Sequence, residues 1–439
     1  MSLFLNKRLS LVFCLLVSGL SLFAQDKPVA MIVDDSFLRT SIKESWLMES
    51  PGSVLAKGGI IYNLPGGGRV ELRSEDAGNE FMVIIARELS GNFPVWSQGS
   101  WSLTRNKATG VPVRIRIFLR SDPYTYVQFK PLDKDRSQME VALYDAFVVR
   151  SLPLPVNMER LYTMPLNEVL KLAGGKFPSR YFESNPQDYR EQRIFISKVR
   201  ENLPQLNYID DGAIDQNGNY VYIKTGGIQE GEQGLNCSGF AKWLIDGILM
   251  PVTGKRLDIA SLKEPFGKRG SSLTDAWEEL RDPFFGLDWI RNLASQTWSI
   301  LRSPDFGNLN EFEVRKEPFS RLRIRRMGGV SDRAFTGFQE NAGYEMEALL
   351  PLLYTLAIDE PGRIYLAAVN NEIGAPVTKE NPRGRPRMRQ YFHVAAFVPY
   401  FNENGVFQVA VFESAAETSI NALINRYPGH FVNLVRIPL

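Results

Sequence analysis

The feature that most constrains the fold is a succession of strand-forming segments in the first third of the chain. Between Val54 and Arg150, apolar and β-branched residues alternate with polar ones, most clearly in Val113–Leu119, Tyr124–Lys130 and Met139–Arg150. Turn-forming clusters such as Pro-Gly-Gly-Gly at 65–68 separate the segments. This pattern predicts a small all-β domain over residues 25–155.

The remaining sequence mixes helical and strand patterns. A helical connector is expected over 156–204, with helices at Pro165–Gly175 and about Pro186–Leu203. Asn217-Gly218 then predicts a hairpin turn within Ala213–Ile223. From about 250 to 360 helical patterns dominate, after which 362–370 returns to a strand pattern. A chain of 439 residues with this organisation is expected to form two or three domains.

The N-terminus has the pattern of an export signal. Lys7 and Arg8 precede an apolar run from Leu9 to Phe23, and Ala24 provides a small residue for cleavage. Residues 1–24 are therefore predicted to be a signal peptide, and Cys14 would leave with it. No later apolar run is long enough to cross a bilayer, so no transmembrane span is expected after signal removal. The predicted location is the periplasm or cell envelope, or the medium.

Charge and metal-ligating residues exclude several classes of function. Without the signal, the 51 Lys and Arg residues fall to 49, which equals the number of Asp and Glu residues. A chain with balanced charge has no overall positive potential that would attract nucleic acid. The mature chain keeps one cysteine, Cys237, and two histidines, so it forms no internal disulfide and no structural thiolate zinc site. No metal or cofactor is expected.

Cys237 lies where a loop becomes a helix. Phe240, Ala241, Leu244 and Ile248 repeat at helical spacing after it, which places Cys237 at the helix N-terminus. The positive end of the helix dipole and the unpaired N–H groups favour a thiolate there, and the same donors can hold an oxyanion. An isolated cysteine in a helix is more often a buried apolar residue, so this location needs a base beside it to carry chemistry.

His393 is the better placed of the two histidines, and His430 is more typical of a surface or packing residue. His393 begins the strand pattern His393–Tyr400, and a return strand runs to Ser414 after a turn. A loop over Phe401–Gly405 pairs Tyr400 with Val406 and places His393 opposite Glu413 on the same face. Glu413 is then the orienting acid of a Cys-His-acid triad. If the register of the hairpin were shifted by one residue, Ser414 would take the place of Glu413 as the third residue.

These residues resemble a family of known enzymes. The sequence Cys237-Ser238-Gly239-Phe240 at a helix start, followed downstream by a strand and by His393-Val394 in a hairpin, resembles the NlpC-type cell-wall endopeptidases. These are papain-like cysteine peptidases that cleave amide bonds in peptidoglycan stem peptides. The resemblance implies an α+β fold in which a Cys-bearing N-terminal helix packs on an antiparallel sheet carrying the His.

The resemblance also implies roles for individual residues. Cys237 would be the nucleophile, His393 the base and Glu413 the orienting residue. Tyr222 or Tyr220 would help to bind the oxyanion, and Asn236 and Ser238, which flank Cys237, are oxyanion or substrate-binding candidates. The family usually has Asp before the cysteine and commonly His, Asn or Gln as its third residue, where this chain has Asn236 and Glu413.

Two further features fall outside the family pattern. The interval between Cys237 and His393 is longer than usual, which predicts a large helical insertion at about 250–360 that covers the cleft, within a catalytic domain over 205–439. Arginines cluster at 321–326 and 383–389. Arg389 is a candidate for binding a substrate carboxylate, although exposed loop arginines are more often only solvated.

The leading hypothesis is an exported cysteine hydrolase acting on a peptidoglycan peptide or another cell-envelope substrate, with no nucleic-acid partner. The same triad would also serve an acyltransferase or amidase that acts on a lipid or another amide. A non-enzymatic alternative is an inactive binding or scaffold protein of the cell envelope. The sequence leaves the oligomeric state open.

Overall fold

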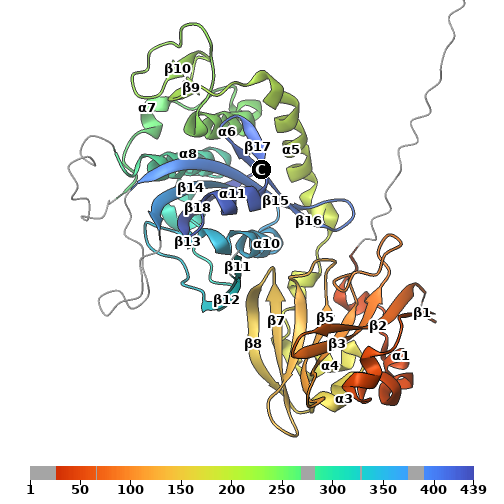
Figure 1. Ribbon diagram of the computed structural model, residues 1–439. Coiled ribbons are helices and arrows are strands. Elements are labelled where there is room, and N and C mark those ends of the chain that lie inside the picture. The colour runs from red at the N-terminus through yellow and green to blue at the C-terminus, as the bar shows by residue number, and fades with distance from the viewer. Residues whose placement is uncertain (1–25, 66, 268–281, 327–328, 374–389) are drawn as a thin grey trace, which may run out of the picture.

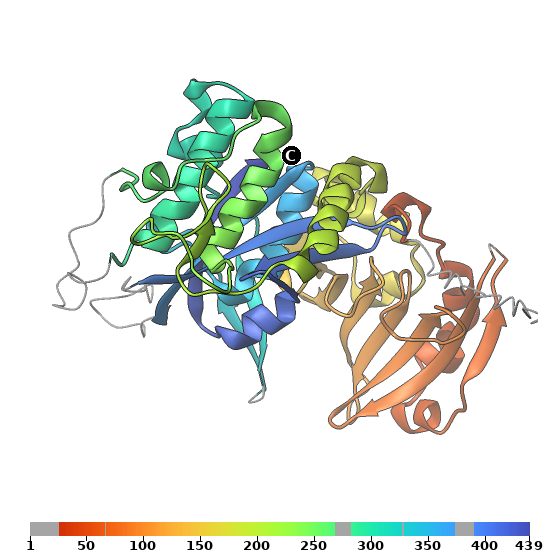
Figure 2. The ribbon, with the colours of Figure 1, turned by 90° about the horizontal axis from the view of Figure 1, so that it is seen from above.

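The computed structural model describes residues 26–65, 67–267, 282–326, 329–373 and 390–439, and these form two units that lie side by side (Figures 1 and 2). The predicted signal peptide, the helical pattern that begins at Thr274 and the candidate Arg389 fall outside the described residues. The architecture is mixed α+β with large antiparallel sheets. Within the described part, none of the helices is long and apolar enough to cross a membrane.

The N-terminal unit is built on an antiparallel meander in which each strand pairs with the next. Its strands are β1 (Ile60–Asn63), β2 (Arg69–Ala77), β3 (Glu80–Arg87), β4 (Trp101–Asn106), β5 (Pro112–Phe118), β6 (Tyr126–Pro131), β7 (Ser137–Leu143) and β8 (Ala146–Leu154). Val70 and Leu72 are fully buried, whereas Arg69 and Glu71 between and beside them are more accessible. This alternation buries one face at the start of β2, as the period-two pattern predicts.

The N-terminal unit is not all-β, because helices cover the buried face of its sheet. These helices are α1 (Ser36–Ser41), the π-helical turn η2 (Lys43–Leu47), α2 (Pro51–Leu55), α3 (Met158–Thr163) and α4 (Leu166–Leu172). The buried guanidinium of Arg39 in α1 donates to the carbonyls of Tyr162 and Met164, each at 2.8 Å. The first half of the predicted connector 156–204 therefore belongs to this unit, since an amphipathic face is needed to close its core.

The same sheet continues into the C-terminal half of the chain. Strand β11 (Arg321–Arg326) pairs with β8 and with β12 (Gly329–Ala334), which gives ten strands in all (Figure 1). Arg325 forms an ion pair with Asp145 in the turn after β7 at 2.6 Å, and Arg323 donates to the hydroxyl of Tyr126. The arginine cluster 321–326 is thus part of a junction between the two units rather than a solvated loop.

The C-terminal unit is built on a six-stranded antiparallel sheet with the order β13-β18-β14-β15-β16-β17. Its strands are β13 (Tyr344–Glu345), β14 (Arg363–Ile373), β15 (Tyr391–Phe401), β16 (Phe407–Glu413), β17 (Ala416–Thr418) and β18 (His430–Pro438). A separate hairpin, β9 (Gly212–Ile214) with β10 (Tyr220–Tyr222), turns at Asn217-Gly218 as the sequence predicts.

Helices cover both faces of this sheet (Figures 1 and 2). On one face, α6 (Cys237–Thr253) and α8 (Phe285–Leu301) pack against each other and against β15. On the other face, α10 (Leu349–Asp359) and α11 (Ile420–Arg426) share a core with the opposite side chains of the same strands. The remaining helices are α5 (Arg190–Asn202), α7 (Ile259–Leu262) and α9 (Leu309–Phe312).

The predicted insertion at about 250–360 is therefore not a helical cover outside the domain. Its helices α8 and α10 lie on the two faces of the main sheet, and its hairpin β11–β12 extends the N-terminal sheet. The near-continuous apolar run of α10 suits a helix buried between layers, whereas a cover would expose one polar face. Trp289 and Trp298 of α8 are both buried.

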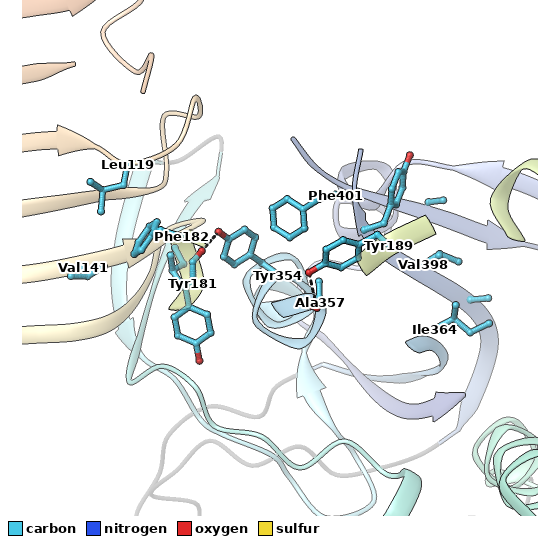
Figure 3. Packing of buried hydrophobic residues seen from close by; sticks show 14 of the residues in the cluster. Leu119, Val141, Tyr181, Phe182, Tyr189, Tyr354, Ala357, Ile364, Val398 and Phe401 are labelled. Carbon is cyan, nitrogen blue, oxygen red and sulfur yellow. Dashed lines mark hydrogen bonds between the residues drawn. The ribbon is translucent and has the colours of Figure 1, made fainter. Parts of the chain in front are cut away.

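The two units share one apolar core. Leu119 and Val141 of the N-terminal sheet belong to the same cluster as Tyr354, Val398 and Phe401 of the C-terminal unit (Figure 3). The hydroxyl of Tyr354 donates to the carbonyl of Tyr181 across this region. The guanidinium of Arg120, only 5% exposed, lies over the Phe401 ring and donates to the Tyr354 hydroxyl and to Ser184 Oγ.

Candidate active site

Cys237 is the first residue of α6, and the helix begins there because of a local cap. The side chain of Asn236 accepts the N–H of Gly239 at 2.8 Å, which is the usual role of Asn at an N-cap. As the first helical residue, Cys237 has a backbone N–H that no preceding helical carbonyl accepts. Asn236, predicted to bind substrate, thus has its side-chain oxygen committed to holding the helix start.

Close backbone contacts fix this helix start against β9. A Cβ atom on Gly239 would lie 2.0 Å from the carbonyl oxygen of Gly212, and one on Gly234 would lie 2.5 Å from that of Asn207. No side chain can be accommodated at either distance, so both positions require glycine. The cysteine thiol is therefore placed by backbone packing.

Gln229 organises the loop that leads to Cys237. Its buried side chain donates to the carbonyls of Val221 and Gly234 and accepts the N–H of Gly234 at 2.9 Å. The N–H of Leu235 also bonds to the carbonyl of Asn207. These bonds bring the segment after α5 next to the start of α6.

Tyr208 lies in that segment, close enough to Cys237 for the two groups to interact electrostatically. Desolvation raises the pKa of Tyr208, and the charges of Asp210 and Cys237 raise it further. The Tyr208 side chain is 56% exposed. Sequence reasoning missed this residue because nothing in the local pattern links it to the cysteine.

His393 is the third residue of β15 and follows a bulge in the strand. Val369 of β14 pairs with His393, but the next residue, Asn370, pairs with Tyr391, so Phe392 is an extra residue. A bulge of this kind bends a strand and changes the direction of its side chains. Phe392 and His393 consequently both contact the Tyr427 ring, with centroids 5.3 and 5.8 Å away.

The predicted hairpin is present, but its register differs from the expected one. Tyr400 pairs with Gln408 rather than Val406, because the loop spans 402–406 and Phe401 pairs with Phe407. Asn402 closes this loop by accepting the N–H groups of Asn404 and Val406 through its side chain. The two-residue difference leaves every side chain on its predicted face.

Glu413 consequently still reaches His393, although from a diagonal position. Oε2 of Glu413 lies 2.5 Å from Nε2 of His393. Ser414, the alternative third residue, has a φ of 49° and forms with Ala415 the tight turn between β16 and β17. Of the two candidates, only Glu413 contacts the imidazole.

Cys237 meets His393 at an open edge of β15. In the described chain β15 pairs with β16 only from Ala396 to Phe401, so the N–H of Val394 is available and donates to the Cys237 sulfur. Cys237 also hydrogen-bonds with His393. Since Nε2 of the imidazole faces Glu413, Nδ1 is the nitrogen left for the thiol.

The electrostatics favour a thiolate and an imidazolium. Burial alone would raise the pKa of Cys237, but hydrogen bonding and charge interaction with His393, together with donors at Val394 and Ser238, lower it below its usual value. Burial opposes protonation of His393, yet its bonds with Cys237 and Glu413 raise the pKa of the imidazole to about 9. These shifts favour the thiolate–imidazolium pair over the neutral thiol and imidazole.

Glu413 has a second partner that the sequence did not reveal. Nη1 of Arg426, the last residue of α11, lies 2.8 Å from Oε1 of Glu413. Burial raises the pKa of Glu413, but His393 and Arg426 more than offset this and hold it below its usual value. A carboxylate bonded on both oxygens remains ionised beside the imidazolium.

The other predicted residues take different positions. Ser238 is buried, interacts with Cys237 through its side chain and accepts the indole N–H of Trp289 on its carbonyl at 2.8 Å. Tyr222 and Tyr220 lie on β10, and β9 is the strand of that hairpin that packs on α6. His430 stacks with Phe392 and Tyr427. It is a packing residue, as expected.

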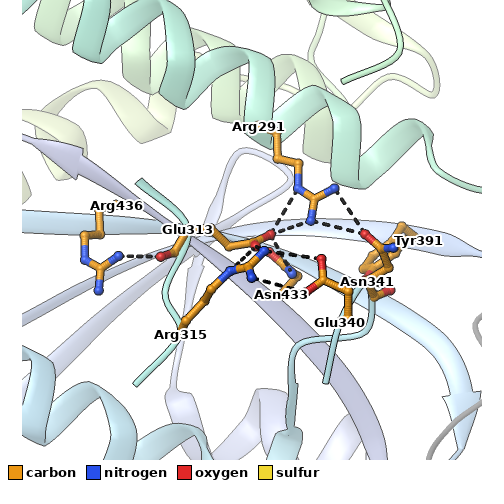
Figure 4. A network of polar contacts seen from close by, with 8 residues as sticks. All are labelled: Arg291, Glu313, Arg315, Glu340, Asn341, Tyr391, Asn433 and Arg436. Atoms are coloured by element: carbon orange, nitrogen blue, oxygen red, sulfur yellow. Dashed lines mark hydrogen bonds and ion pairs between the residues drawn. The ribbon is translucent and has the colours of Figure 1, made fainter. Parts of the chain in front are cut away.

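A buried polar network supports the start of β15 (Figure 4). The Glu313 carboxylate accepts from Arg291 of α8, from Arg315 and from Asn433 of β18. Arg291 also donates to the Asn341 side chain, and the Asn341 carbonyl accepts the hydroxyl of Tyr391. Tyr391 is two residues from His393, so this network helps to fix the strand that carries the imidazole.

Comparisons with known proteins identify only part of the chain. Residues 28–181 match the model of a domain of unknown function, DUF8515. No curated protein and no solved structure matches the chain. The match covers the N-terminal unit with α3 and α4, and the candidate site lies beyond it. In the described residues no group of three or more His, Cys, Asp or Glu side chains is arranged to hold a metal ion.

Proposed function

We propose that this protein is a papain-like cysteine hydrolase. The observation that supports the proposal is the hydrogen-bonded series Cys237–His393–Glu413, with the thiol at a helix N-terminus and the imidazole on the sheet against which that helix packs. A thiol far from the imidazole would have favoured the non-enzymatic alternative of an inactive binding or scaffold protein. Their contact favours the enzyme.

The proposed reaction is acyl transfer to water. The Cys237 thiolate attacks an amide carbonyl carbon, and the carbonyl oxygen becomes an oxyanion. The N–H of Cys237 and the hydroxyl of Tyr208 are the proposed donors to that oxygen, with Tyr208 in the role that the resemblance gave to Tyr222 or Tyr220. The His393 imidazolium then protonates the leaving amine, which departs and leaves a thioester.

Deacylation uses the same groups in the opposite order. Neutral His393 removes a proton from water, the resulting hydroxide attacks the thioester, and Cys237 leaves as the thiolate beside the imidazolium. Glu413 keeps the imidazole oriented and stabilises its cation throughout. By resemblance to the NlpC-type endopeptidases, the proposed substrate is a peptidoglycan stem peptide, and residues 1–24 are the proposed export signal.

The pH dependence of Cys237 alkylation tests whether the nucleophile is activated. The ion pair should exist above the lowered pKa of Cys237 and below about pH 9, where His393 loses its proton. Iodoacetamide should therefore react quickly well below pH 8.5, near which an ordinary thiol ionises. His393→Ala should move the rise in rate toward that ordinary value. Slow alkylation of both proteins would contradict the proposal.

Hydrolysis of purified stem peptides tests the substrate. The wild-type protein should release one amine-bearing and one acid-bearing fragment per bond cleaved, and Cys237→Ala should release neither. Cys237→Ala is the matched control because it removes only the nucleophile. If Cys237 reacts quickly with iodoacetamide but no stem peptide is cleaved, the proposal of a cysteine nucleophile would stand and that of a peptidoglycan substrate would be rejected.

A further inference from the structure

Arg426 is the charged residue nearest to the triad that has no role in the mechanism above. It lies at the C-terminal end of α11, on the face of the sheet that also carries Glu413. Its Nη1 contacts Oε1 of Glu413, and Oε2 of the same carboxylate contacts His393. The carboxylate is thus held between a permanent cation and the imidazole.

Arg426 also contacts a second neighbour of His393. Its guanidinium lies over the Tyr427 ring at 5.6 Å from the centroid, and the Tyr427 ring packs against the imidazole. Among the residues that the structure describes, the ionisable groups that face the imidazole or its carboxylate are Cys237 from α6, Glu413 from β16, Arg426 from α11, and Tyr427. Arg426 is the fixed positive charge in this described set.

We propose that Arg426 is a positioning residue of the site. It fixes the Glu413 carboxylate against His393, and its positive charge reduces the stabilisation that this carboxylate gives to the imidazolium. The proposal rests on the proposed function, in which His393 must give its proton to the leaving amine. An imidazolium that is stabilised too strongly would retain that proton, since a general acid works best with a pKa near the working pH.

Two roles of Arg426, an electrostatic one and a purely structural one, predict opposite shifts in the pKa of His393 when Arg426 is removed. If Arg426 withholds charge, its removal places a full carboxylate charge beside His393, and the pKa of His393 rises above about 9. If Arg426 only held Glu413 in place, its removal would let the Glu413 carboxylate move away from the imidazole. The pKa of His393 would then fall. The direction of the shift separates these roles.

The pKa of His393 can be measured by NMR of the imidazole nitrogens, because the chain has only two histidines. His430→Gln identifies the His393 signal. Arg426→Gln keeps a hydrogen-bond donor without the charge and should raise the pKa of His393 by roughly half a unit. Arg426→Lys should restore the wild-type value.

Arg200→Gln is the matched control. Arg200 is about as exposed as Arg426, pairs with Glu417 at 2.7 Å and does not contact the triad, so its loss should leave the pKa of His393 unchanged. An unchanged or lowered pKa of His393 in Arg426→Gln would overturn the proposal. If that variant fails to fold, Arg426→Met provides the same comparison. The measurement needs no substrate, so failure to cleave stem peptides would reject the proposed peptidoglycan substrate without deciding this inference.

Discussion

Single side chains in this site perform more than one task, and Glu413 is the clearest case. It is nearly inaccessible to solvent, bonds to His393 with one oxygen and to Arg426 with the other. A buried carboxylate with both oxygens engaged has one orientation, which also fixes the tautomer of its histidine partner. The triad depends on this carboxylate for geometry as much as for charge.

Glu413→Gln should remove the charge and preserve the shape of the side chain. Without the carboxylate, the pKa of His393 should fall from about 9 toward its usual value near 6.5, and the ion pair should lose the alkaline part of its pH range. Amide hydrolysis should fall by roughly 10²- to 10⁴-fold. Steady-state kinetics beside Glu417→Gln, the matched change at the neighbouring ion pair, checks this. Equal losses in both variants would remove Glu413 from the triad.

Sequence patterns identified the residues of the triad better than their supports. Cys237, His393 and Glu413 belong to local patterns, namely a helix start and an alternating hairpin, and period-two alternation kept Glu413 on the correct face although the register was wrong by two residues. Tyr208 and Arg426 reach the site through contacts distant in sequence. No local periodicity records such contacts, so neither was predicted.

Among the elements, α6 and β15 position the site by different means. The start of α6 is fixed by glycines in close contact with neighbouring backbone, whereas β15 is bent by the bulge at Phe392 and supported through Tyr391. A bulge depends on how two strands match along their length, so the alternation of one strand does not reveal it. The sequence therefore predicted the strand and the side on which His393 meets Glu413, but not the bulge at Phe392.

Gly239→Ala tests the packing of α6. The added Cβ would lie 2.0 Å from the carbonyl oxygen of Gly212, so the helix must move away from β9. We expect a loss of about 1–3 kcal/mol in the free energy of unfolding, together with slower alkylation of Cys237. Gly247→Ala is the matched control in the same helix, because nothing lies within 4 Å of its added Cβ. It should stabilise the helix by up to ~1 kcal/mol. Equal effects in denaturant titrations would contradict this account.

At the scale of the whole molecule, the two units are joined by a shared core and a shared sheet (Figures 1 and 3). The sequence predicted the strand-rich first unit and the mixed second unit, but it gave no structural role to the arginine-rich segment 321–326. Pairing of β11 with β8 joins residues far apart in the chain. The partners of Arg323 and Arg325 lie in the first unit, at Tyr126 and Asp145, so no local pattern could predict them.

Arg120→Ala tests the junction between the units. Arg120 is buried and donates to Tyr354 and Ser184 across the boundary, so its removal leaves polar groups without partners and a cavity beside Phe401. We expect the free energy of unfolding to fall by about 2–4 kcal/mol. Arg190→Ala, which removes a side chain that is 70% exposed, should change it by less than about 0.5 kcal/mol. Similar values in thermal and denaturant unfolding of both variants would show that Arg120 does not hold the junction.

The pairing of β8 with β11 has a consequence during synthesis. A ribosome makes the first eight strands early, but β11, which pairs with Ala146 and Phe147 at the start of β8, is not made until Arg321–Arg326. In the interval this end of β8 is an uncovered sheet edge, a template for pairing with other chains. Shortened chains that end before Arg321 should therefore aggregate more readily than the full chain, because this end of β8 has no strand to pair with.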